Sequence, residues 1–275
     1  MHLTSMCVMK RKDYLEKYES VNEFIKTLNE RIKSYKGEIY DPSFKFCGTN
    51  SLDEANDLFY HGDKENADKV TAAKAKIKAQ GKGYETRNSL YNSPCGFMPI
   101  VPKVLAGEPN NMLAIKKQRY NSTKVLNIVF DLWVNCGISK EERAEISIKV
   151  LNVITGLERK GYRINLYAGC EFELDEKTHA GLLIKIKDSG KYTDILRIAY
   201  PLINASFLRR HCFNWLNVSN TPEGKQKRYY GILHKDSERF FSQYVKNASI
   251  FNFHSLRGLT EKGITKYIER QNKAF

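Results

Sequence analysis

The sequence predicts an open α/β sheet flanked by helices, preceded by a helical and irregular amino-terminal region. An apolar strand, an amphipathic helix and a second apolar strand follow one another between residues 125 and 168. Hydrophobic residues make up 41% of the chain and aromatic residues 12%, which is enough to bury a sizeable core. The length of 275 residues fits one large or two small domains. We expect the amino-terminal region over residues 1–120 and the α/β domain over residues 121–275.

The first elements are expected to be helices. Over residues 11–36, apolar side chains recur at spacings of three and four, which predicts an amphipathic, charged helix. Ser20 followed by Glu23 also fits a capping box, which would instead divide the segment into two helices. A shorter helix is predicted over residues 51–60, with Ser51 as its N-cap.

Two segments of biased composition follow. Residues 63–83 are rich in Lys and Ala and poor in large apolar side chains, which is typical of a solvated helical linker. The alternative for this segment is a mobile arm that contacts nucleic acid. Residues 84–124 hold four of the seven prolines, and we expect an ordered loop or linker there rather than a periodic element.

The strongest pattern begins at Val125. Residues 125–131 are β-branched or large and apolar except for Asn127 and Asp131, which predicts a buried strand. Ser139, with a Glu three positions later, is an N-cap for a long helix over residues 140–160. A second strand is predicted over residues 162–168. Strand, helix and strand in this order predict two parallel strands joined by a crossover helix, as in Rossmann-like sheets.

The rest of the chain continues the alternation. A strand is expected over residues 181–187, and a helix from about residue 193 that Pro201 bends or ends. The aromatic-rich residues 206–217 fit either a helix or a strand. Further on, we expect a strand over residues 229–233 and helices over residues 236–246 and 258–271.

Asp131 is the first candidate site residue. It lies where the predicted strand ends, and ligands of open α/β sheets bind at the carboxyl ends of strands. The run from Asp131 through Trp133 to Asn135 resembles a degenerate form of the metal-site motif Asp-x-Ser-x-Ser of von Willebrand factor A-like domains. The resemblance implies a vWA-like fold and a possible Mg²⁺ site with Asp131 and Asn135 as remaining oxygen ligands. The alternative is that Asp131 only caps the turn, with no cofactor bound.

A second resemblance covers residues 47 to 217. Its segments are Gly48–Ala55 with His61–Asp63, Pro99–Met112, Ser139–Leu157 with Gly161–Arg163, and Phe207–Arg210. Together they resemble an uncharacterised protein family encoded in bacteriophages and related mobile elements. The resemblance implies a phage or mobile-element origin and no particular activity.

The net charge of +14 points to a polyanionic partner or to simple solubility. The last 69 residues carry thirteen Lys and Arg against five acidic residues, interleaved with aromatic side chains. This composition is typical of surfaces that bind single-stranded nucleic acid, although most such rings serve in cores. The candidates for phosphate binding are Arg209, Arg210, Lys225, Lys227 and Arg228, and those for base stacking are Tyr229 and Tyr230.

The sequence lacks a nucleophile elbow, a Walker A loop, a dinucleotide-binding glycine motif and a zinc-deaminase signature. Glu171 and Glu173 form a possible acid pair, but two surface carboxylates are the commoner outcome. The six cysteines are widely spaced. No apolar run is long enough to be a signal peptide or a membrane span. Because disulfides form mainly in secreted proteins, we expect reduced thiols.

These observations favour a phage-type, non-enzymatic binding protein in the bacterial host cytoplasm, with protein or nucleic acid as its partner and no membrane contact. One alternative is a nucleic-acid-processing enzyme or single-strand binder that uses the basic carboxyl-terminal quarter. Another is a virion or assembly component.

Overall fold

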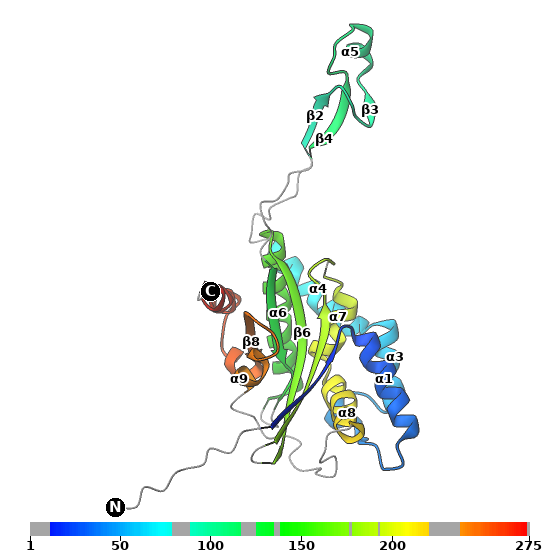
Figure 1. Cartoon of the computed structure of the whole chain (residues 1–275), viewed down its shortest axis with the longest axis vertical. Helices are drawn as coiled ribbons and strands as arrows, with labels where there is room; N and C mark the ends of the chain where they lie inside the picture. The colour runs from blue at the N-terminus through cyan, green and yellow to red at the C-terminus, as the bar shows by residue number, and fades with distance from the viewer. Residues whose placement is uncertain are drawn as a thin grey trace, which may run out of the picture.

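The computed structural model describes residues 12–78, 89–116, 125–134, 138–175, 178–191, 193–219 and 237–273. A mixed five-stranded sheet in the order β1-β7-β6-β5-β8 forms its centre (Figure 1). The strands of this sheet are β1 (Lys12–Tyr18), β5 (Val125–Asp131), β6 (Arg163–Asp175), β7 (Thr178–Lys187) and β8 (Ala248–Asn252). The α/β fold class with an open sheet flanked by helices is therefore confirmed, whereas the relation to vWA-like domains stays a prediction.

The predicted strand–helix–strand unit is confirmed. Strand β5 leads into α6 (Lys140–Arg159), and β6 then pairs parallel with β5. The Ser139 hydroxyl accepts a hydrogen bond from Glu142 N at 3.1 Å, as expected of the N-cap. Strand β8 joins the other side of β5, also parallel, so three strands end at the same edge of the sheet. The sequence pattern does not predict this strand at residues 248–252.

The helix expected from residue 11 onward is wrong over residues 12–18. These residues form β1, which pairs parallel with β7, while β7 pairs antiparallel with β6. The spacing of Leu15 and Tyr18 fits a helix, but pairing with the otherwise open edge of β7 satisfies the backbone over the whole segment. The Ser20 cap is confirmed, because its hydroxyl accepts from Glu23 N at 3.1 Å, but it separates a strand from a helix. Residues 1–120 thus contribute a strand to the sheet.

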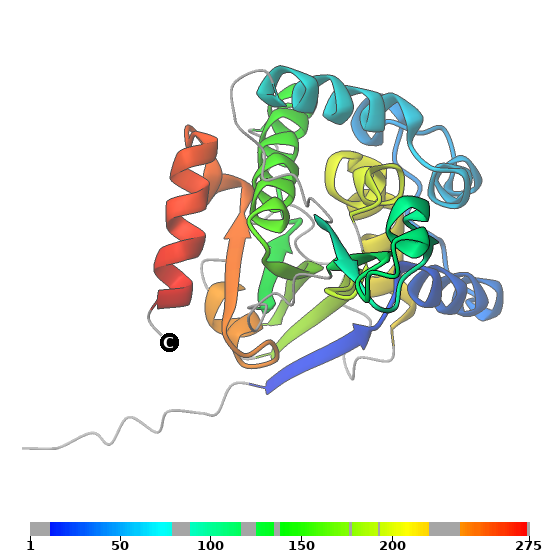
Figure 2. The same ribbon diagram turned by 90° about the horizontal axis from the view of Figure 1, so that it is seen from above.

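Most helices cover one face of the sheet (Figure 2). We call the five-stranded sheet and the helices around it the body. Besides α6, its helical elements are α1 (Val21–Ser34), α2 (Phe44–Cys47), α3 (Leu52–His61), α4 (Lys64–Lys78), α7 (Ile195–Ile203), the π-helix η1 (Phe207–Cys212), α8 (Phe213–Val218), α9 (Ser237–Ser242), α10 (Phe253–Leu256) and α11 (Glu261–Lys273). The helices predicted near residues 51, 140, 193 and 258 are thereby confirmed, and residues 206–217 are helical. The Lys-rich α4 buries Val70, so it packs on the body as well as facing solvent.

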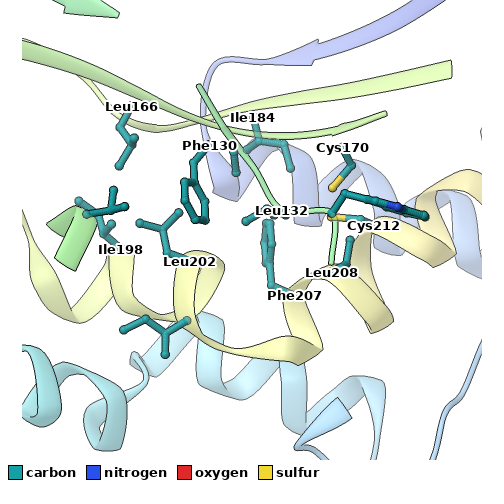
Figure 3. Close-up of a cluster of buried hydrophobic side chains, with 14 of the residues drawn as sticks. Phe130, Leu132, Leu166, Cys170, Ile184, Ile198, Leu202, Phe207, Leu208 and Cys212 are labelled. Carbon is teal, nitrogen blue, oxygen red and sulfur yellow. The ribbon is translucent and has the colours of Figure 1, made fainter. Parts of the chain in front are cut away.

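The main core lies between the sheet and α7 with η1. Side chains of alternate residues on β5, β6 and β7, such as Phe130, Leu166 and Ile184, face Leu202 and Phe207 from the helical layer (Figure 3). Burial of this continuous apolar surface is the main contribution to stability.

The opposite face of the sheet carries a smaller cluster under α9. Val129, Tyr167 and Leu183 pack there against Phe240 and Phe241. The rings lie so close that a Cβ atom on Gly181 would come within 2.2 Å of the Phe240 ring. Glycine at this position therefore permits α9 to lie directly on the sheet.

A second, three-stranded sheet lies apart from the body in Figure 1. It comprises β2 (Ser89–Ser93), β3 (Met98–Pro99), α5 (Val101–Leu105) and β4 (Met112–Lys116), in the strand order β2-β4-β3. We call residues 89–116 the arm. The expectation that residues 84–124 hold no periodic element is wrong for this part. Its turn is tight, because a Cβ atom on Gly96 would lie 2.1 Å from the Leu113 carbonyl oxygen.

Candidate functional site at the carboxyl edge of the sheet

The candidate site lies where β5 ends and α6 begins. Strands β5, β6 and β8 run in the same direction, so their carboxyl ends meet on one side of the sheet. Ligands of open α/β sheets bind at such an edge. Polar side chains that are almost completely buried lie there on both faces of the sheet, and each face is described in turn.

Asp131, Glu171 and His179 occupy the face that α9 covers. Side chains two or four positions apart on a strand point to the same face of the sheet. The three residues are spaced in this way from Val129, Tyr167 and Leu183 of the small cluster under α9, so their side chains lie on the same face as that cluster. The His179 Nδ1 atom lies 2.9 Å from Glu171 Oε1, and the Glu171 side chain is 1% exposed. Glu171 is therefore not the surface carboxylate that the sequence favours, whereas Glu173 is half-buried.

Asp131 is buried against this cluster. Its Oδ1 accepts a hydrogen bond from Trp133 N at 3.0 Å, and the Ser237 hydroxyl also donates to it. Burial raises the pKa of Asp131 to about 7, and the negative charge of Glu171 adds to the rise, while the two hydrogen bonds oppose it. The carboxyl group therefore titrates close to neutral pH. By accepting this hydrogen bond from Trp133 N, Asp131 caps the turn after β5, as the alternative interpretation of the sequence expects.

The described residues do not provide the further ligands that the predicted Mg²⁺ site at Asp131 would need. Within these ranges, no group of three or more His, Cys, Asp or Glu side chains is arranged to hold a metal ion. Asn135, the second predicted ligand, lies outside the described residues. A cation at Asp131 would also have to displace the proton that this buried carboxyl holds below about pH 7. Metal binding at Asp131 thus stays a prediction.

Arg143 is the main polar residue on the other face. It lies in the first turns of α6 and is 3% exposed. Its guanidinium stacks 5.2 Å from the centre of the Phe253 ring, and Nη2 donates to the Asn204 carbonyl at 3.4 Å. Its Nε atom is buried and has no hydrogen-bond partner among the described residues. No sequence pattern singled out Arg143, because a charged residue in a helix usually faces solvent.

Cys170 and Cys212 lie beside Arg143 in the core. Their side chains are hydrogen-bonded to each other, and the sulfur atoms lie side by side in Figure 3. Burial raises the pKa of the Cys170 thiol, and the neighbouring Cys212 raises it further. Both cysteines are free, as are Cys47 and Cys95. Reduced thiols as such stay a prediction.

The structure corrects the expectation that Arg210 binds phosphate. Arg210 is fully buried in η1, and its Nε and Nη2 donate to Thr49 Oγ1 and to the carbonyls of Pro42 and Thr49. Its Nη1 contacts the Asp41 carboxylate. Every guanidinium nitrogen is thereby used inside the protein. Adjacent positions on a helix point in different directions, so Arg209 is half-buried and lies near Arg143 instead.

The other predicted nucleic-acid residues are Lys225, Lys227, Arg228, Tyr229 and Tyr230, and they lie outside the described residues, as does the strand expected at 229–233. Several aromatic side chains that flank them in sequence are core residues. Phe213, Trp215, Phe240 and Phe251 are each at most 3% exposed. Those rings are therefore not available to stack on bases.

Comparison with known proteins gives the family. Residues 4–273 match the family described as Domain of unknown function (DUF7192). The chain belongs to this family. Searches for similar curated proteins and for similar solved structures found no match. The described helices of this DUF7192 protein include none that is long and apolar enough to cross a membrane.

Proposed function

We propose that the chain is a non-enzymatic, phage-type binding protein that acts in the bacterial host cytoplasm by contacting another protein through the arm. The phage part of this proposal rests on the resemblance of the segments between residues 47 and 217. The protein-binding part rests on the surface of the arm, which differs from that of the body in apolar content and in charge.

One observation carries the proposal. Eight of the fourteen large apolar side chains that are exposed in the described part of the chain lie within the arm. They are Leu90, Tyr91, Phe97, Met98, Val101, Val104, Leu105 and Ile115. No side chain of the arm whose burial is described is buried. Exposed apolar patches of this density mark interaction sites, because leaving them in water is unfavourable.

The geometry of the arm supports the same conclusion. A three-stranded sheet needs one covered face to be stable, and the arm lies away from the helices that cover the main sheet (Figure 1). Val101, Val104 and Leu105 share one face of the short helix α5, where they are 60%, 45% and 83% exposed. A partner with an apolar groove would cover this face.

Charge favours a protein over nucleic acid as the partner of the arm. The arm holds only three charged residues, and Lys103 pairs with Glu108 at 2.9 Å. Binding to a phosphate backbone depends on several unpaired Lys and Arg side chains. The arm provides apolar contact area instead, which is typical of the centre of a protein–protein interface.

A photo-crosslinking experiment tests the proposal. A photoreactive amino acid at Leu105 is expected to capture one defined protein in infected cells, whereas the same amino acid at Tyr60, which is 57% exposed on α3, is not. The charge introduced by Val101→Asp is expected to abolish the capture at position 105. Equal capture from both positions, or capture that survives Val101→Asp, would contradict the role of the arm. A virion protein as the captured species would place the chain in assembly.

A further inference from the structure

The positive charge of Arg143 has no negative partner among the residues that the structure describes. Arg143 is 3% exposed, its contacts are a carbonyl oxygen and an aromatic ring, and its Nε is a buried donor without an acceptor in those ranges. The adjacent acid, Glu142, pairs with Arg257 at 2.7 Å instead. Buried charges are normally paired, because taking an unpaired charge out of water is costly. This arrangement is therefore one that a bound anion would complete.

Two further sources of positive potential lie at the same place. The charge of Arg209 acts on Arg143: burial first, and the positive charge of Arg209 second, together lower the pKa of Arg143 to about 10. At neutral pH the Arg143 side chain nevertheless remains charged. Arg143 also lies in the first turns of the 20-residue helix α6, where the helix dipole attracts anions. Two guanidinium groups near a helix amino terminus are a common setting for a bound phosphate group.

We propose that Arg143 and Arg209 bind a small phosphate-type oxyanion at the amino end of α6. This site is independent of the arm. Arg143 Nε would donate to one oxygen of the anion, and the half-buried Arg209 would contact it from the solvent side. Arg143 is too deeply buried to reach the backbone of a nucleic-acid duplex, so the ligand is a free phosphate or the terminal phosphate group of a small molecule.

Thermal unfolding of the full chain with inorganic phosphate, compared with chloride at equal ionic strength, tests the site. We expect saturating phosphate to raise the melting midpoint of the parent protein by about 2 °C or more. Arg143→Met is expected to remove this rise. In phosphate-free buffer Arg143→Met is expected to melt no lower than the parent, because it removes an uncompensated buried charge. A purely structural Arg143 would give the opposite result.

Arg159→Met is the matched control, because Arg159 lies at the other end of the same helix and is exposed. It is expected to keep the full response to phosphate. The absence of any rise in the parent protein would overturn the proposal. A rise in Arg143→Met equal to that of the parent would do the same.

A second variant keeps the proposal testable if Arg143→Met does not fold. Arg209→Met alters a half-buried side chain, and we expect it to weaken phosphate binding, measured by calorimetry, about tenfold. Unchanged affinity would contradict the role of Arg209.

Adenosine monophosphate and adenosine distinguish the two sources of phosphate. Tighter binding of the monophosphate than of inorganic phosphate indicates a terminal phosphate group, and weaker binding indicates free phosphate. Equal binding of adenosine and the monophosphate would overturn phosphate recognition.

Discussion

Arg210 donates two hydrogen bonds to Thr49 across 161 positions of the chain, from Nε to the hydroxyl and from Nη2 to the carbonyl, each at 2.7 Å. The same guanidinium contacts Asp41 and the Pro42 carbonyl. This set of bonds fixes the irregular segment before α3 to the helical layer of the core. It also explains why a residue that resembles a phosphate ligand in the sequence serves the fold.

Replacement of Arg210 by Met is expected to lower the free energy of unfolding by about 3–5 kcal/mol, because the polar atoms of Asp41, Pro42 and Thr49 lose a buried partner. Urea unfolding measures the change. Arg197→Met is the control, since the Arg197 side chain is 77% exposed, and we expect it to shift the free energy by no more than about 0.5 kcal/mol. Similar effects of the two substitutions would show that the Arg210 bonds contribute little.

Because the pKa of Asp131 is raised in the folded protein, we expect the free energy of unfolding to depend on pH. The Asp131 pKa of about 7 in the folded protein lies above the value of about 3.9 for an unfolded chain. Between these values the folded state binds more protons, so this residue's contribution to the free energy of unfolding is complete below about pH 4 and is lost as pH rises to about 7. Asp131→Asn removes the titrating group and is expected to gain stability relative to the parent over this range, by roughly 1–4 kcal/mol.

Urea unfolding at several pH values from 4 to 8 measures this difference. Asp57→Asn is the matched control, because Asp57 is exposed on α3. Its stability relative to the parent is expected to stay nearly constant with pH. A constant difference between Asp131→Asn and the parent would mean that Asp131 titrates normally in the folded protein.

Two glycines are expected to respond oppositely to replacement by Ala. A Cβ atom on Gly181 would meet the Phe240 ring at 2.2 Å, so Gly181→Ala should displace α9 and cost about 1–3 kcal/mol. Gly156 lies within α6, where an added Cβ atom would meet no neighbouring atom of the described residues within 4 Å, so Gly156→Ala should stabilise the protein by about 0.5–1 kcal/mol. Thermal and urea unfolding distinguish these signs. Destabilisation of equal size at both positions would contradict the close contact of α9 with the sheet.

Thiol labelling of the folded protein tests the burial of the cysteines. Cys95 is exposed on the arm, whereas Cys47, Cys170 and Cys212 are buried. Burial also raises the pKa of the Cys170 thiol, which lowers its reactivity further. Cys95→Ser should therefore remove one rapidly labelled thiol, whereas Cys170→Ser should leave the number of rapidly labelled thiols unchanged. Rapid labelling of Cys170 would indicate that the core near Arg143 opens to solvent.

Elements with local signals can be predicted from the amino-acid sequence. The cap at Ser139, the apolar spacing of residues 140–160 and the two flanking strands predict a parallel pair, and the structure contains it. The Ser20 cap is likewise evident from the sequence. Such signals can be read from the chain because a cap or an amphipathic face depends on residues a few positions apart.

The other features depend on contacts between segments that are distant in the sequence. Residues 12–18 have a helix-compatible spacing and form a strand, because β7 offers them an open edge. Arg209 and Arg210 are neighbours in η1, yet their side chains point in different directions. Arg210 binds Thr49, whereas Arg209 lies near Arg143 of helix α6. Glu171 is buried because β6 places it on the face that α9 covers. Each of these outcomes depends on pairing and burial between distant segments, which local composition does not encode.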